Sequence, residues 1–148
     1  MGNTYSQIFI HLVFSTKYRT PSLKQEFEGK LKSLIIRSAQ EFEIHVMAIG
    51  GTADHLHVLF GIPPKISVSK AAQIIKGSSS KWLNDHFFDK QKSRWQRGYG
   101  AFSINKSLVP TTINYIKRQK EHHSGVTYQD EFKAILDKHD INKTNTAH

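Results

Sequence analysis

The sequence has 148 residues, a formal net charge of +9 at pH 7, 38% hydrophobic residues and no cysteine. This length is typical of one domain with a single hydrophobic core, which excludes a wholly disordered chain. The lack of cysteine excludes disulfides, thiolate zinc sites and cysteine nucleophiles. No stretch is apolar enough to span a membrane, and the start MGNTYSQIF is not typical of a secretory signal, so we expect a cytoplasmic protein. The net charge indicates a polyanionic partner.

Hydrophobic periodicity and turn residues divide the chain into eight elements. In chain order we predict a strand at residues 7–15, a helix at 22–42, strands at 44–50 and 55–60, a helix at 68–83, a strand at 101–104, and helices at 110–123 and 127–138. Ser22 and Gln25 match a capping box at the start of the first helix, and Pro110 opens the third. We predict one domain, residues 1–138, followed by a disordered tail at residues 139–148.

The order of the first six elements is typical of one α+β fold. Strand, helix, strand, strand, helix, strand is the split βαβ, or ferredoxin-like, arrangement. It predicts an antiparallel sheet with two helices on one face and the other face open to ligands. An extra helix at residues 110–123, which carries Tyr115, follows towards the C-terminus.

The positive charge is concentrated in one part of the chain. Residues 62–104 hold eight basic and two acidic side chains, and residues 105–123 hold four and one. Trp82, Trp95 and Tyr99 lie in the same stretch. Cations interleaved with flat rings are typical of single-stranded nucleic-acid binding, whereas the alternative is a solvated basic surface over core aromatics. The candidate contacts are Lys76, Lys81, Arg94, Arg97, Lys117 and Arg118.

A pair of histidines lies in the third predicted strand. Side chains two residues apart on a strand point to the same face, so His55 and His57 share one face while Leu56 and Val58 share the other. On the open face their ring nitrogens could converge on one metal ion. The alternative is a pair of half-exposed surface histidines.

The helix at residues 110–123 carries a polar stripe. At 100° per residue, Tyr115, Gln119 and His122 lie close together, and Ile113 and Ile116 lie off that stripe. A phenol and an amide oxygen could therefore enter the histidine site from one helix. The alternative is a tyrosine at the border of a solvated basic face.

Taken together, the segments HLVFSTKYR, DHLHVLF, WQRGYGAFSI and YIKRQKEHH resemble a known family. They are similar, in order and spacing, to the small single-tyrosine HUH transposases of bacterial and archaeal insertion sequences (TnpA-like) and their repeat-associated relatives. The resemblance covers about residues 5–123. It implies that Tyr115 is the nucleophile, that His55, His57 and Gln119 hold the metal, and that Asp54 orients the first histidine. It also implies DNA contacts by Lys17, Tyr18 and Arg19.

The resemblance implies a metal-dependent strand transfer on single-stranded DNA with a hairpin near the element end. Tyr115 would form a 5′-phosphotyrosine, and rejoining would excise or insert a mobile element. Mg²⁺ or Mn²⁺ fits the oxygen ligands best. The resemblance also implies a homodimer.

Three other functions are open at this point. An HUH replication initiator or relaxase-type nickase, or a domesticated repeat-processing nuclease, would share the site. A non-enzymatic single-strand nucleic-acid binding module would display aromatic side chains where this chain has the two histidines. A metal-dependent hydrolase would need an activated water and a general base.

Overall fold

The computed structural model describes residues 2–89, 92–123 and 125–141. The elements are β1 (Phe9–Ser15), α1 (Glu28–Gln40), β2 (His45–Gly51), β3 (His55–Gly61), α2 (Val68–Asn84), β4 (Gly100–Ile104), α3 (Val109–Lys117), α4 (Gln119–His122) and α5 (Tyr128–Lys138), with short 3-10 turns at Lys17–Arg19, Gln25–Phe27 and Lys106–Leu108. The four strands pair antiparallel in the order β2-β3-β1-β4. This order confirms the predicted α+β, ferredoxin-like arrangement. In the described residues, no helix is long and apolar enough to cross a membrane.

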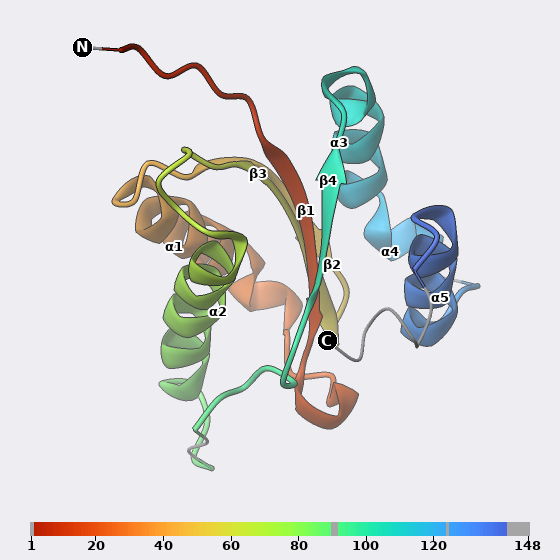
Figure 1. Cartoon of the computed structure of the whole chain (residues 1–148). Coiled ribbons are helices and arrows are strands. Elements are labelled where there is room, and N and C mark those ends of the chain that lie inside the picture. The colour runs from red at the N-terminus through yellow and green to blue at the C-terminus, as the bar shows by residue number, and fades with distance from the viewer. Residues whose placement is uncertain (1, 90–91, 124, 142–148) are drawn as a thin grey trace.

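The main core lies between the sheet and the helices α1 and α2, which cover one face (Figure 1). Alternate side chains of β1 and β3 point into it, and Leu12, Val58 and Phe60 are fully buried there. Ile35 of α1 and Ile75 of α2 meet them from the helix layer. Period-two alternation in the strands and period-3.6 spacing in the helices therefore produce one two-layer core.

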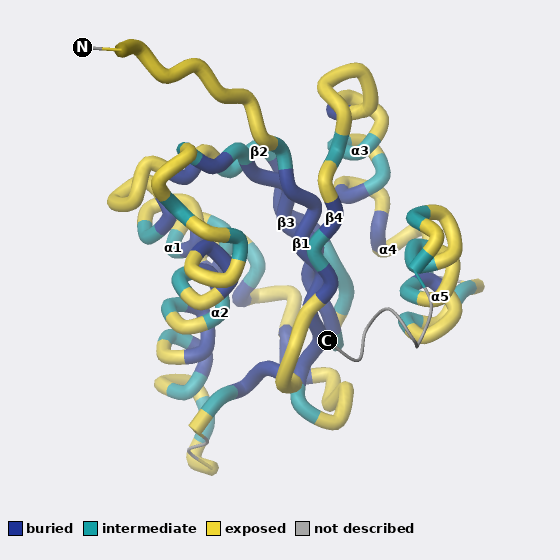
Figure 2. Tube along the Cα trace, viewed as in Figure 1, coloured by how far each residue is buried: buried dark blue, intermediate teal, exposed yellow. Residues whose placement is uncertain are grey.

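The opposite face of the sheet is not open, which corrects the sequence-based expectation. Helix α3 packs on β2 and β3, and a second, smaller core of Ala48, Leu59, Val109 and Ile116 joins them. Helices α4 and α5 lie on the same side (Figure 1), and the tube in Figure 2 is dark blue along the sheet beneath this layer. The expectation was wrong because Val109 and Ile116 provide an apolar stripe that must be buried.

The start of the first helix differs from the prediction. The first helix begins as a 3-10 turn at Gln25, and Ser22 caps nothing: its hydroxyl lies 3.4 Å from the carbonyl oxygen of Thr20. Leu23 is tied to the β2–β3 turn by a backbone hydrogen bond to Ala53 (3.0 Å), which holds this segment out of the helix.

The third predicted helix is broken. Arg118 has φ −101° and ψ 20°, outside the α-helical region, and separates α3 from α4. Beyond α5, His139 stacks on Phe102 with ring centroids 4.7 Å apart. Residues 142–148 of the predicted tail lie outside the described residues.

Candidate active site

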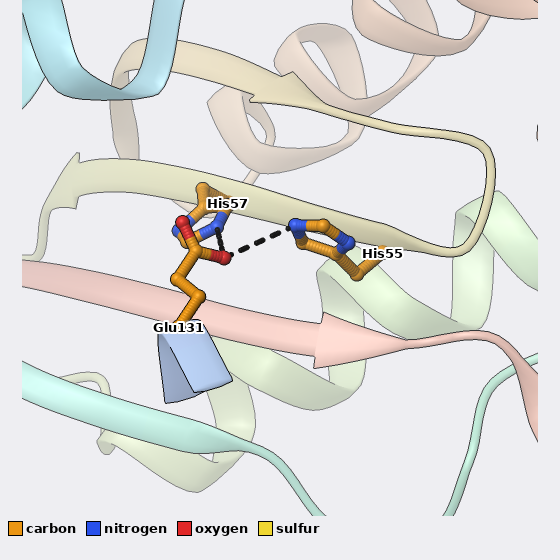
Figure 3. Close-up of side chains that lie close together, drawn as sticks. All are labelled: His55, His57 and Glu131. Carbon is orange, nitrogen blue, oxygen red and sulfur yellow. Dashed lines mark hydrogen bonds and ion pairs between the residues drawn. The ribbon is translucent and has the colours of Figure 1, made fainter. Parts of the chain in front are cut away.

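His55 and His57 lie on the face of β3 that α3, α4 and α5 cover. Both side chains are fully buried, rather than displayed on an open surface. Figure 3 shows the two rings side by side along β3, with the side chain of Glu131 of α5 extending to both. The alternation of β3 thus places the pair as predicted, and the C-terminal helices enclose it.

Both ring nitrogens of His55 have hydrogen-bond partners, which fix the orientation of the ring. Nδ1 lies 2.8 Å from Asp54 Oδ1 and 3.0 Å from the hydroxyl of Thr52, and Nε2 lies 3.0 Å from Gln119 Oε1. Burial lowers the pKa of His55, but hydrogen bonds to Glu131, Asp54 and Gln119 outweigh it and raise the pKa above its ordinary value. Asp54 therefore sits where it can set the ring orientation of His55.

The ring of His57 is oriented by another histidine. His57 Nδ1 lies 2.8 Å from His11 Nε2, and the two rings stack with centroids 5.0 Å apart. Burial, with His57 nearby, lowers the pKa of His11 to about 3, so His11 is neutral at physiological pH. Burial also holds the pKa of His57 below its ordinary value. His11 on β1 thus positions His57 in the way that Asp54 positions His55.

Tyr115 projects from α3 towards the two histidines. Its ring centroid lies 5.6 Å from that of His57, and its hydroxyl donates a hydrogen bond to Glu131 Oε2. Burial and this hydrogen bond raise the pKa of Tyr115 well above its ordinary value. The structure therefore brings Tyr115, His55, His57 and Gln119 into one site, as the sequence predicted.

Sequence reasoning missed His11 and, above all, Glu131. Its Oε1 lies 3.2 Å from His55 Nε2, 3.1 Å from His57 Nε2 and 2.9 Å from His123 Nε2, and its Oε2 accepts from the amide of Gln119 at 2.8 Å. Burial opposes its ionisation, but hydrogen bonds from His55 and His57 lower its pKa well below the ordinary value. A carboxylate among the apolar residues of an amphipathic helix was the available signal, because Glu131 shares a face with Tyr128 and Ile135.

The ligand atoms at this position suit a divalent ion. Those of His55, His57 and Glu131 lie within 4.8 Å of one another, and His122 and His123 form a second such group with the same carboxylate. Gln119 turns its amide oxygen, not its nitrogen, towards His55. Imidazole nitrogens with carboxylate and amide oxygens are ligands that Mn²⁺ and Mg²⁺ accept. These residues therefore fit a divalent metal ion.

The predicted DNA contacts fall into two groups. Most are at the surface: Tyr18, Arg19, Lys81, Arg97, Lys117 and Arg118 are exposed, and Lys17 is half-buried. Lys76 is half-buried, and its ammonium donates to the carbonyl oxygens of Gln96 (3.1 Å) and Gly98 (2.8 Å).

Arg94 differs from the others. Only 6% of it is exposed, and its guanidinium donates to Asn84 and Asp89 and stacks on Phe87. We therefore assign Arg94 to the support of this segment and not to DNA contact.

A family match and a curated relative both identify this chain as similar to the IS200 transposases. Residues 4–119 match the family described as "Transposase IS200 like". The transposase for insertion sequence element IS200 of Salmonella typhimurium is 34% identical over 116 residues, which are 75% of this chain and 76% of that protein.

Two solved structures have a similar fold. A putative transposase from Deinococcus radiodurans R1 superposes with a TM-score of 0.63 at 24% identity, over 80% of this chain and 96% of that one. A REP-associated tyrosine transposase bound to a REP hairpin superposes with a TM-score of 0.61 at 17% identity, over 85% and 76%. The match to the family includes His55, His57, Tyr115 and Gln119 and ends before α5. The chain therefore belongs to the IS200-like transposases, enzymes that act on DNA.

Proposed function

We propose that this protein cleaves and rejoins single-stranded DNA through a covalent bond to Tyr115, as the transposase of a mobile element. One observation carries the proposal: the hydroxyl of Tyr115 and the side chains of His55, His57 and Gln119 meet around a single buried carboxylate. In a member of a transposase family, a tyrosine beside such a ligand set is suited to attack a phosphodiester.

His55, His57 and Gln119 would hold the divalent ion, with Glu131 in reach, and we propose Mg²⁺ or Mn²⁺. When bound, the ion would withdraw charge from the phosphate and favour in-line attack on its phosphorus atom. Asp54 and His11 each hold the Nδ1 side of one histidine, so both Nε2 atoms face the site.

Tyr115 supplies the nucleophile. Its hydroxyl loses a proton as its oxygen forms a bond to phosphorus, and the bond from phosphorus to the 3′ oxygen breaks. That oxygen takes up a proton, so the released strand ends in a 3′-OH. A 5′-phosphotyrosine remains, and attack by another 3′-OH reverses the step without ATP. Because the Tyr115 hydroxyl is bound to Glu131 Oε2, the carboxylate fixes the direction in which the phenol oxygen faces.

The substrate that we propose is a single strand with a hairpin. The exposed cations Lys81, Arg97, Lys117 and Arg118 offer sites for several phosphates. The structure of a REP-associated relative bound to a REP hairpin supports the same class of DNA here. Because the site is enclosed between sheet and helices, a flexible strand can reach it more readily than a duplex.

The test is a labelling experiment with a hairpin strand taken from the DNA beside the gene. With Mg²⁺ or Mn²⁺, a 3′-label should migrate with the denatured protein, and a 5′-label should appear on a shorter free strand. Tyr115→Phe should form no adduct. An adduct that persists in the Phe variant, or a 5′-label on the protein, would refute the assignment.

Strand joining distinguishes a transposase from a nickase or a repeat-processing nuclease. Adding a second strand with a 3′-OH should release the adduct and produce a joined product. We also propose a homodimer, in line with the family resemblance. Sedimentation equilibrium of the full chain should give about twice the 16.9 kDa chain mass.

A further inference from the structure

The turn after β1 displays an aromatic ring on a strained backbone. Tyr18 and Arg19 have φ values of 56° and 53°, the left-handed region that residues other than glycine rarely adopt. The side chain of Tyr18 is 84% exposed. Two consecutive residues in this conformation cost free energy, and such strain gathers at functional sites.

The surrounding structure holds this turn in place. The hydroxyl of Thr16 donates to Thr20 O at 2.7 Å, and the backbone N–H of Tyr18 donates to Gln96 Oε1 at 3.3 Å. Lys17 N donates to Arg94 O at 2.9 Å. The ring of Tyr18 is therefore presented from a fixed backbone and not from a loose loop.

Two clefts lie at this turn and share four lining residues. The first, of about 710 Å³, is lined by Tyr18, Arg19 and Gln96 on one side and by α5 on the other. The second, of about 720 Å³, runs from the same pair to Asp54 and His123 at the active site. The shared residues are Tyr18, Arg19, Tyr128 and Gln129.

Aromatic side chains line the inner wall of the clefts and continue to the ring of His55. The ring of Tyr128 lies 4.6 Å from that of His55, and Phe132 stacks on Tyr128 at 5.7 Å. Rings with amide groups beside them form the kind of surface that receives an unpaired base, which stacks on its face and hydrogen-bonds along its edge. Gln96 and Gln129 provide those amides.

We propose that the clefts between Tyr18 and Tyr128 bind an unpaired nucleotide of the DNA strand, next to the phosphate that is cleaved. Lys17, Arg19 and Lys133 lie at or beside the first cleft and suit the phosphates on either side of that base. The inference rests on the proposed function and adds a subsite for one base. α5 supplies half of it and lies beyond the part of the chain that matches the family.

The experiment uses the full chain in chelator, so that no strand is cleaved. Hairpin strands carry 2-aminopurine at one flanking unpaired position at a time, and its fluorescence reports stacking. We expect strong quenching at one position with the wild type. Tyr18→Asn should abolish it, because asparagine tolerates the left-handed backbone but has no ring. Affinity for the flanked strand should fall roughly 5-fold to 150-fold, the usual effect of losing one stacked base.

The controls distinguish the loss of the Tyr18 ring from the loss of its hydroxyl, from the loss of any exposed ring, and from a general loss of DNA binding. Tyr18→Phe should behave as wild type. Tyr5→Asn should do the same, because it removes a similarly exposed ring (88%) that precedes β1 and lines neither cleft. A hairpin without flanking bases should bind Tyr18→Asn as tightly as wild type.

Two results would overturn the subsite. One is the absence of a quenched position or of an affinity change in Tyr18→Asn. The other is an equal loss of affinity for the bare hairpin. Adduct formation by the wild type tests the proposed function separately, so an active enzyme with an unaffected Tyr18→Asn would refute the subsite alone.

Discussion

Gly50→Ala should separate the nucleophile from the two histidine ligands without removing any side chain of the site. Gly50 lies opposite His57 in the β2–β3 ladder, directly beneath α3. A Cβ added there would lie 2.1 Å from the carbonyl oxygen of Ile116, whereas ordinary contacts begin at 3.4 Å. The backbone of α3 would have to move by about 1.3 Å. Tyr115 precedes Ile116, so it would move as well.

The expected loss can be estimated from that displacement. A misplacement of about 1 Å commonly costs on the order of 100-fold in rate. Overpacking of this kind also lowers the free energy of unfolding by about 1–3 kcal/mol, or roughly 3–10 °C in Tm. Single-turnover adduct formation at saturating metal measures the first effect, and thermal denaturation measures the second.

Gly77→Ala is the matched control, since a Cβ at this position of α2 meets nothing within 4 Å. It should leave the rate unchanged and raise stability by up to about 1 kcal/mol, because glycine is a poor helix former. If Gly50→Ala forms the adduct at the wild-type rate, α3 does not depend on this close approach, and our account of how Tyr115 is positioned is wrong.

Three further predictions concern the site and the DNA surface. Tyr115→Phe should bind the hairpin strand with unchanged affinity in a gel-shift assay and keep its Tm within a few degrees, because it loses one hydroxyl. His57→Ala should abolish the rise in Tm that Mn²⁺ causes, because a ligand is lost. It should also lower the metal-free Tm, because removal of a fully buried ring leaves a cavity. A wild-type metal response in this variant would contradict the ligand assignment. Replacing Lys81 and Arg97 together by alanine should flatten the plot of log affinity against log salt by about 1.4 units, at roughly 0.7 per phosphate contact. Lys30→Ala on the neighbouring helix α1 should not change it.

The fold and most of the site follow from local patterns. Alternation alone places His55 and His57 on one face of β3, and helical spacing predicts Gln119 on the same side as Tyr115. Both patterns depend on residues close in sequence. The break at Arg118 does not show in the spacing, because it belongs to the packing of two short helices against the sheet.

The parts that sequence reasoning missed depend on long-range contacts. Glu131 meets His57 across 74 positions of the chain, and only the docking of α5 brings them together. In the sequence, Arg94 is one of several cations in a basic stretch, which predicts an exposed side chain. In the structure it is buried by its contacts with Asn84, Asp89 and Phe87. Charge alone could not separate it from Arg97, because burial depends on neighbours that the charge pattern does not specify.

The two cores differ greatly in size, and this has a consequence for motion. α1, α2 and the sheet share the large core, whereas α3 is held by the small cluster around Ala48, Leu59 and Ile116. Amide hydrogens of α3 should therefore exchange with solvent faster than those of β1 and β3, because a local opening needs less free energy than global unfolding. We therefore expect the layer that carries Tyr115 to open locally while the domain beneath it stays folded.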